Sequence, residues 1–158
     1  MKDDIVSFYY YDEIEFLIKY KYHPFGSRVF KLLAKNSFKL FSQVYKEKVY
    51  SISIDDNVKK GYSHTAILNH ALKSKYITPL YKKLLSKNDV SYAGKDLKFR
   101  MNNPRNFVYT GPKNIDVILV DDVVTTGITL NEAKKVLKEN NVNVIFSMVL
   151  TDKRWGVL

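Results

Sequence analysis

Cysteine is absent from the 158 residues of this chain, and arginine occurs only at Arg28, Arg100, Arg105 and Arg154. Without cysteine the chain can form no disulfide, no thiolate metal site and no cysteine nucleophile. No apolar run approaches the ~20 residues that a membrane-spanning helix needs. The N-terminus carries acidic residues where a signal peptide would carry basic ones. These absences favour a cytoplasmic protein without a membrane partner.

The composition that remains is that of a globular protein, with 46% hydrophobic and 27% charged residues. Its length predicts one domain that spans residues 1–158. The 26 basic residues exceed the 16 acidic ones, which gives a formal charge of +10 and favours polyanionic partners. A bias toward AT-rich codons explains this excess of basic residues equally well, because lysine supplies most of it. Surfaces that bind nucleic acid tend to use arginine instead, for bidentate contacts.

The last third of the chain carries the clearest structural pattern. The continuous apolar run 117–120 predicts a buried parallel strand, residues 129–140 a helix, and residues 142–150 the next strand. Strand, helix and strand in succession predict a right-handed crossover and a parallel sheet covered on both faces. The expected fold is therefore an α/β fold with three layers.

The first two thirds are less regular. We expect a helix capped by Asp12 that runs to Tyr22, a second helix after Ser27, a strand at 49–54 and a helix from about 63 to 74. Residues 77–85 are ambiguous, because a central strand would not accept Pro79. Residues 88–113 are rich in Gly, Pro, Asn and basic side chains, which predicts a long loop with room for a short strand. Loops of this length are more often functional than idle.

The segment 120–129 carries the chemistry. Asp121 and Asp122 follow the apolar strand, at the end of the sheet where ligands of open α/β folds bind. Thr129 and Glu132 have the spacing of a capping box, which places a helix N-terminus and its free amides at the end of the turn. Such amides attract phosphate, and Gly127 lets the backbone come close to the anion.

These residues together predict a cradle for a ribose 5-phosphate. The carboxylates of Asp121 and Asp122 would accept hydrogen bonds from the sugar hydroxyls. The 5-phosphate would be held by Val124, Thr125, Thr126, Gly127, Ile128 and Thr129. The alternative is an acidic turn that merely caps a helix.

An apolar strand, two acids and a Thr-Thr-Gly-x-Thr loop resemble the phosphoribosyl pyrophosphate signature of type I phosphoribosyltransferases. The resemblance implies a three-layer parallel sheet with a small N-terminal helical hood, here residues 1–45. It also implies that Asp121 and Asp122 meet the ribose hydroxyls and that the loop from Thr125 to Thr129 holds the 5-phosphate.

A narrower resemblance is to the ComF family of competence proteins. It rests on three short motifs: the opening Tyr10-Tyr11, Leu17-Ile18 and Lys21-Tyr22; Lys60-Gly61-Tyr62-Ser63-His64, where that family has Arg-Gly-aromatic-Asn-Gln; and Arg100-Met-Asn-Asn103. It implies a role in natural transformation, with phosphoribosyl pyrophosphate, incoming single-stranded DNA and DNA-uptake proteins as partners. The four-Cys zinc finger that often precedes this domain is missing, so the sequence is a finger-less version or begins after the finger. A basic stripe that would suit DNA comprises Lys31, Lys35, Lys39, Lys46 and Lys48, and solvated lysines are the alternative.

The resemblance further implies a pyrophosphate-binding loop and a flexible catalytic loop. The first comprises Asp55, Asp56, Asn57, Lys59 and Lys60, with Mg²⁺ bound through the diphosphate rather than by a dedicated protein cluster. The second offers Lys95, Lys98 and Arg100 to neutralise the leaving diphosphate. The alternatives are a solvated turn and solvated surface charges. We expect a phosphoribosyltransferase whose acceptor the sequence does not identify. The alternative function is that of a nucleobase salvage phosphoribosyltransferase.

Overall fold

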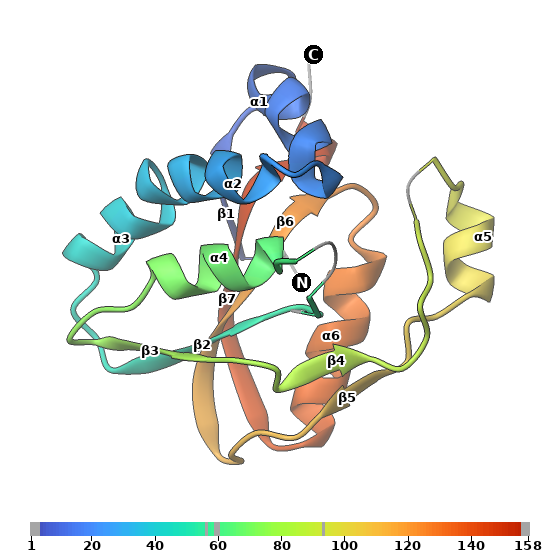
Figure 1. The fold of residues 1–158 in the computed structure, drawn as a ribbon. Helices are drawn as coiled ribbons and strands as arrows, with labels where there is room; N and C mark the ends of the chain where they lie inside the picture. The colour runs from blue at the N-terminus through green and yellow to red at the C-terminus, as the bar shows by residue number, and fades with distance from the viewer. Residues whose placement is uncertain (1–3, 56, 59–60, 93, 156–158) are drawn as a thin grey trace.

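The chain forms one five-stranded parallel sheet, described by a computed structural model for residues 4–55, 57–58, 61–92 and 94–155 (Figure 1). The strand order is β1-β7-β6-β2-β3. The strands are β1 (Ile5–Tyr9), β2 (Val49–Ser53), β3 (Ile77–Leu80), β6 (Ile115–Val124) and β7 (Val142–Asp152). All four neighbouring pairs run parallel, which confirms the predicted α/β fold with a parallel sheet.

Helices cover both faces of this sheet (Figure 1). Successive residues of a strand point to opposite faces. Ile118 and Val120 of β6 accordingly pack with the core of the N-terminal helices and α4, whereas Val117 and Leu119 pack with α6. The helices are α1 (Tyr11–Ile18), α2 (Gly26–Lys35), α3 (Phe38–Val44), α4 (His64–Ala71) and α6 (Ile128–Glu139). The three-layer arrangement is therefore confirmed.

Strand β6 is longer than the apolar run that predicts it. It lies between β2 and β7, and its pairing with β7 continues from Asp121 opposite Val149 to Val124 opposite Asp152. Because β7 continues to supply backbone partners beyond Val120, where the pairing with β2 ends, the two acids remain part of the strand. They nevertheless lie near its carboxyl end, as the sequence predicts.

The N-terminal segment begins with a strand that the sequence pattern did not indicate. Residues Ile5–Tyr9 form β1 and pair with the edge of β7, so the helical region starts at Tyr11. The predicted Asp12 cap was wrong. Tyr10 is the N-cap of α1, and its backbone N–H donates to the Glu13 carboxylate at 2.9 Å. The 3₁₀ turn η1 (Lys19–Tyr22) follows and lies above the carboxyl end of β6 (Figure 1).

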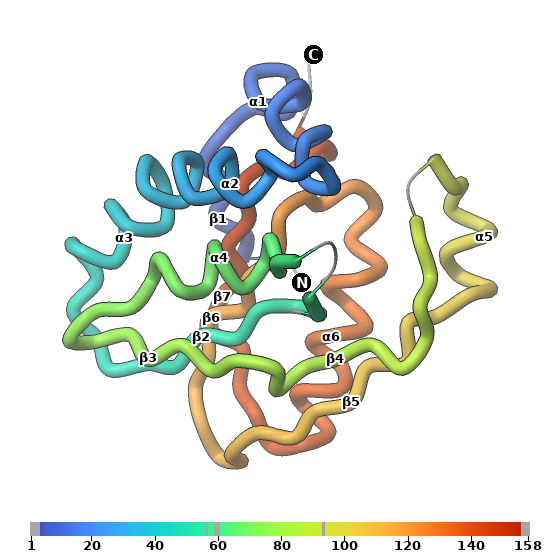
Figure 2. The backbone as a smooth tube through the Cα atoms, viewed as in Figure 1, coloured from blue at the N-terminus to red at the C-terminus, as the bar shows by residue number. Residues whose placement is uncertain are grey.

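The ambiguous and loop segments form a projecting arm. Pro79 lies in β3, an edge strand, where its missing N–H is tolerated. Strands β4 (Leu84–Ser86) and β5 (Phe107–Tyr109) pair antiparallel at the base of the arm. The predicted loop between them also contains the short helix α5 (Leu97–Asn102), which stands away from the sheet beside the start of α6 (Figure 2).

Candidate functional site

The acid pair lies almost buried near the end of β6, with 9% of Asp121 and 6% of Asp122 exposed. The Asp121 Oδ1 accepts a hydrogen bond from the backbone N–H of Asp122 at 2.8 Å. The Asp122 Oδ1 accepts one from the backbone N–H of Val123, also at 2.8 Å. These local contacts orient both carboxylates at the edge where the strands end.

Two basic side chains from other elements converge on Asp122. The Lys21 Nζ of η1 lies 3.0 Å from the Asp122 Oδ2, and the His64 Nε2 at the start of α4 lies 3.4 Å from the same oxygen. The Tyr62 hydroxyl donates to the backbone carbonyl of Lys21 and so holds η1 beside the start of α4. Sequence reasoning assigned no role to Lys21 or His64, because each is far from Asp122 along the chain.

The two carboxyl groups have opposite pKa shifts. Burial and the neighbouring Asp122 charge raise the pKa of Asp121 well above its usual value. Burial also acts to raise the pKa of Asp122, but Lys21 and His64 outweigh it, so the pKa of Asp122 lies below its usual value. The Asp122 charge in turn raises the pKa of Lys21. Asp122 is therefore the firmly ionised member of the pair, and Asp121 takes up a proton more readily.

The turn after β6 opens into α6 at Gly127. This glycine is the N-cap and has a φ of 80°, in the left-handed region that glycine adopts without a steric penalty. The predicted capping box of Thr129 and Glu132 was wrong, because the helix begins at Ile128. The Glu132 carboxylate instead accepts the backbone N–H groups of Arg105 at 3.2 Å and Asn106 at 2.6 Å.

The predicted phosphate residues surround this helix start. Val124 is buried, Thr126 is exposed, and the Thr126 Oγ1 accepts the Ile128 N–H at 3.5 Å. Thr129 lies in the first turn of α6, whose first N–H groups have no acceptor within the helix. Hydroxyls and backbone donors are thus gathered at one end of α6.

Arg154 is a further cation at this turn, and no motif pointed to it. It lies in the 3₁₀ turn η2 (Lys153–Trp155) after β7. The buried carboxylate of Asp152 holds its guanidinium with contacts of 2.7 and 3.0 Å. The Arg154 Nη1 would lie 3.2 Å from a Cβ placed on Gly127, so a side chain at position 127 would crowd the guanidinium.

The predicted pyrophosphate loop is only partly described. The Asp55 carboxylate binds Arg105 at 3.1 Å and accepts the Ser86 backbone N–H at 3.0 Å. The Asn57 side chain donates to the same carboxylate at 2.8 Å. Asp55 thus ties the end of β2 to the arm. Asp56, Lys59 and Lys60 lie outside the described residues.

Of the three flexible-loop candidates, Arg100 reaches the phosphate turn. Its guanidinium donates to the Thr125 hydroxyl and to the backbone carbonyls of Tyr92 at 3.0 Å and Lys95 at 3.1 Å. The Lys95 Nζ lies 5.0 Å from the centre of the Phe99 ring, and Lys98 is exposed. Arg100 therefore connects the arm to the turn, while the two lysines do not contact it.

The site offers oxygen ligands but no preformed metal cage. Across the ranges that the structure describes, no three His, Cys, Asp or Glu side chains gather around a common point. Within the described residues Asp121 makes no ion pair, and its carboxylate oxygens are ligands of the kind that Mg²⁺ prefers. The residues therefore fit a magnesium ion that arrives with a phosphate ligand. None of the helices formed by the described residues is long and apolar enough to cross a membrane.

Comparison with known proteins shows that part of the chain resembles a known family. Residues 102–157 match the family model of the phosphoribosyl transferase domain. The chain is 25% identical over 126 residues to the adenine phosphoribosyltransferase of Aliarcobacter butzleri, covering 73% of this chain and 65% of that one. It is 45% identical over 42 residues to the transcriptional regulator GfcR of Methanosphaera stadtmanae, covering 27% and 21%.

A solved structure with a partial likeness is the UMP synthase of Leishmania donovani, with 17% identity, a TM-score of 0.49 and coverage of 86% of this chain and 24% of that one. The chain spans less than two thirds of the length of each of these three proteins.

Proposed function

We propose that this phosphoribosyltransferase-like chain binds phosphoribosyl pyrophosphate at the carboxyl end of β6. One observation carries the proposal: a buried acid pair near the end of β6 is followed by a short turn at Gly127 and the N-terminus of α6. Carboxylates accept hydrogen bonds from sugar hydroxyls, whereas helix amides bind phosphate. The two kinds of group follow one another along the chain, in the order that a ribose 5-phosphate requires.

Each part of the ligand has its own residues in this proposal. Asp121 and Asp122 accept hydrogen bonds from the ribose hydroxyls. The 5-phosphate lies on the backbone of residues 124–129 and on the hydroxyls of Thr125, Thr126 and Thr129. Arg154 adds a positive charge to this turn, which contains no cation of its own.

The diphosphate would lie toward the loop after β2. Asp55, Asp56, Asn57, Lys59 and Lys60 are proposed to line it, and Lys95, Lys98 and Arg100 to cover it. A nitrogen nucleophile would attack C1 of the ribose as the bond from C1 to the diphosphate oxygen breaks. The protein would position both groups and stabilise the charge that develops. Mg²⁺ would neutralise the diphosphate that leaves.

A thermal-shift experiment tests the binding site. Saturation at about 100 times the dissociation constant should stabilise the fold by about 2.7 kcal/mol, a rise of several degrees. Asp121→Asn combined with Asp122→Asn should abolish the response to phosphoribosyl pyrophosphate with Mg²⁺. Asp116→Asn is the matched control, because Asp116 lies at the opposite end of β6 and contacts Asn143. A full response in the double variant would reject the assignment.

The acceptor is proposed to be a nucleobase. The adenine phosphoribosyltransferase relative supports this choice, since its match covers 73% of this chain. The helical hood within residues 1–45 would then enclose the base, and Lys21 couples that region to the acid pair. Release of diphosphate should be measured with adenine and with the other common bases. Release with none of them would refute the salvage reaction while leaving ligand binding intact.

A second candidate is a ComF-family role in natural transformation, in the cytoplasm and on single-stranded DNA with DNA-uptake proteins. The sequence motifs support it, and so does a basic cluster around Tyr76. The Nζ atoms of Lys46, Lys48 and Lys75 lie 5.5, 5.9 and 5.7 Å from the centre of that ring. Cations around an aromatic ring are typical of surfaces that bind single strands.

DNA retention distinguishes this candidate. A single-stranded oligonucleotide should be retained at low salt and released as salt rises. Tyr76→Ala combined with Lys48→Gln should weaken retention, whereas Lys135→Gln on α6, which covers the other face of the sheet, should not. No retention at low salt would reject direct DNA binding.

A further inference from the structure

A groove lies along the contact between α2 and α4, on the sheet face opposite α6. Its volume is about 480 Å³, which suits a small molecule rather than a chain. Small and apolar side chains of α2, α4 and the loop after β2 form the floor. They are Ala34, Val58, Ala66, Ile67 and Ala71. Such a floor lets a flat apolar body lie close to the backbone of α4.

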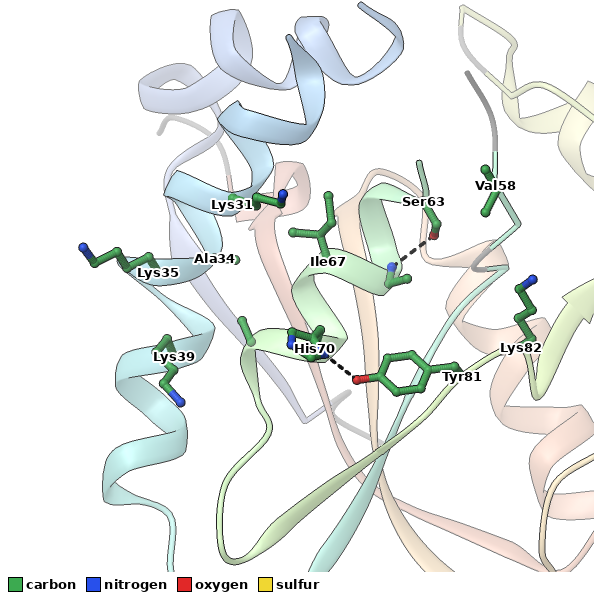
Figure 3. A pocket seen from close by; sticks show the side chains of 12 residues that line it. Lys31, Ala34, Lys35, Lys39, Val58, Ser63, Ile67, His70, Tyr81 and Lys82 are labelled. Atoms are coloured by element: carbon green, nitrogen blue, oxygen red, sulfur yellow. Dashed lines mark hydrogen bonds between the residues drawn. The ribbon is translucent and has the colours of Figure 1, made fainter. Parts of the chain in front are cut away.

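Four lysines surround this floor. Lys31, Lys35 and Lys39 stand on one side, and Lys82 stands on the other (Figure 3). No carboxylate belongs to the residues that line the groove. The Lys39 Nζ donates to the Lys73 carbonyl at 3.3 Å, but it has no acid to neutralise it there. Among the described residues that line the groove, the charged side chains are therefore of one sign, which is complementary to an anion.

An aromatic pair closes one end of the groove. The Nδ1 of His70 and the hydroxyl of Tyr81 are 2.7 Å apart and hydrogen-bonded, and the two rings lie 6.1 Å apart with planes 33° from parallel (Figure 3). At the other end, Ser63 caps α4 by accepting the Ala66 N–H at 3.1 Å. The groove thus has an apolar floor, an aromatic wall and a cationic rim.

We propose that this groove binds a nucleotide, with the base on the alanine floor beside Tyr81 and the phosphate among the lysines. The proposal does not depend on the function proposed for the acid pair. A second copy of the chain is a poor occupant, because its own lysines would meet those of the groove. The limited volume likewise favours one nucleotide over a peptide helix.

Alanine-methyl NMR can locate the ligand directly. Ala34, Ala66 and Ala71 line the groove and are three of the five alanines in the chain. Ala133 lies on the buried side of α6, on the other face of the sheet, and reports on ligands that bind near that helix. Millimolar AMP should shift the three groove methyls together. Adenosine, which lacks the phosphate, and inorganic diphosphate, which lacks the base, should each shift them less.

Replacing two of the lysines tests whether the cationic rim of the groove binds the phosphate. Lys31→Gln combined with Lys35→Gln should weaken AMP binding by about fivefold, the effect of losing two partly exposed charge contacts. It should leave the weaker adenosine binding unchanged. Neither lysine has a hydrogen bond or ion pair in the described part of the chain, so the fold should be preserved. Lys113→Gln combined with Lys138→Gln is the control of equal charge and should leave AMP binding unchanged.

Several results would overturn the proposal. AMP could leave the three groove methyls unshifted or shift only Ala133. Adenosine could bind as tightly as AMP, or the Lys31 and Lys35 variant could bind AMP normally. Groove shifts with a glutamate-rich peptide but not with AMP would assign the groove to a protein partner. Shifts that follow protein concentration, with a doubled mass in light scattering, would assign it to a second copy.

Discussion

At the scale of single residues, Asp121 and Asp122 are adjacent but affect stability in opposite directions. Burial and the Asp122 charge raise the pKa of Asp121 in the folded state, so the folded protein holds that proton more tightly than the unfolded chain. The free energy of unfolding therefore falls as the pH rises from about 4 through the raised pKa of Asp121, because its ionised form is disfavoured in the fold. For Asp122, Lys21 and His64 outweigh the burial effect and lower the pKa. Its stabilisation is present at neutral pH and is lost as pH falls through that lowered value.

Asp121→Asn should raise the melting temperature at neutral pH, because it removes a buried and repelled charge while its amide oxygen can still accept the Asp122 N–H. The gain should vanish in acid, where Asp121 is protonated. Asp122→Asn should instead lower the melting temperature at neutral pH, since it leaves Lys21 without its 3.0 Å partner. Thermal melts between acid and neutral pH measure both effects. Equal shifts in the two variants would contradict the different surroundings of the two acids.

At the scale of elements, Glu132 fastens the arm to α6. Its two hydrogen bonds reach the backbone where the chain returns from α5 to β5. The arm carries Arg100, whose contact with Thr125 places it beside the phosphate turn. The anchor therefore controls how far the arm can move from the site.

Glu132→Ala should free the backbone N–H groups of Arg105 and Asn106. A loss on the order of 2 kcal/mol for hydrogen bonds to a charged acceptor corresponds to exchange that is roughly thirty times faster. Hydrogen exchange with mass spectrometry can follow peptides from the arm. Glu139→Ala is the control on the same helix, because Glu139 is exposed and lies at its end. Unchanged exchange across the arm would show that other contacts hold it.

At the scale of the whole molecule, the formal charge of +10 works against the compact state. The cluster of Lys46, Lys48 and Lys75 around Tyr76 concentrates part of that charge. Raising salt from about 10 mM to about 150 mM shortens the screening length from about 30 Å to about 8 Å. The repulsion among these lysines should weaken accordingly.

The melting temperature should therefore rise with salt over this range. Lys75→Gln should raise it at low salt and have little effect at high salt, because screening already removes the repulsion. Lys19→Gln is the control of opposite sign, since the Lys19 Nζ lies 3.2 Å from the Glu15 carboxylate. Calorimetry at several salt concentrations measures the effect. A melting temperature that falls with salt would show that attractive ion pairs outweigh the net charge.

The sequence by itself determined the parallel core and the order of the acid pair, the glycine turn and the helix. An apolar run and a positive-φ glycine act through short-range sterics and burial, which neighbouring residues suffice to set. The tertiary structure alone decided which partners those residues meet. Lys21 reaches Asp122 across 101 positions, Glu132 takes backbone donors from the arm instead of capping its own helix, and Arg154 lies against Gly127. Such pairings depend on how distant elements pack, because a side chain binds the partner that the fold brings within reach.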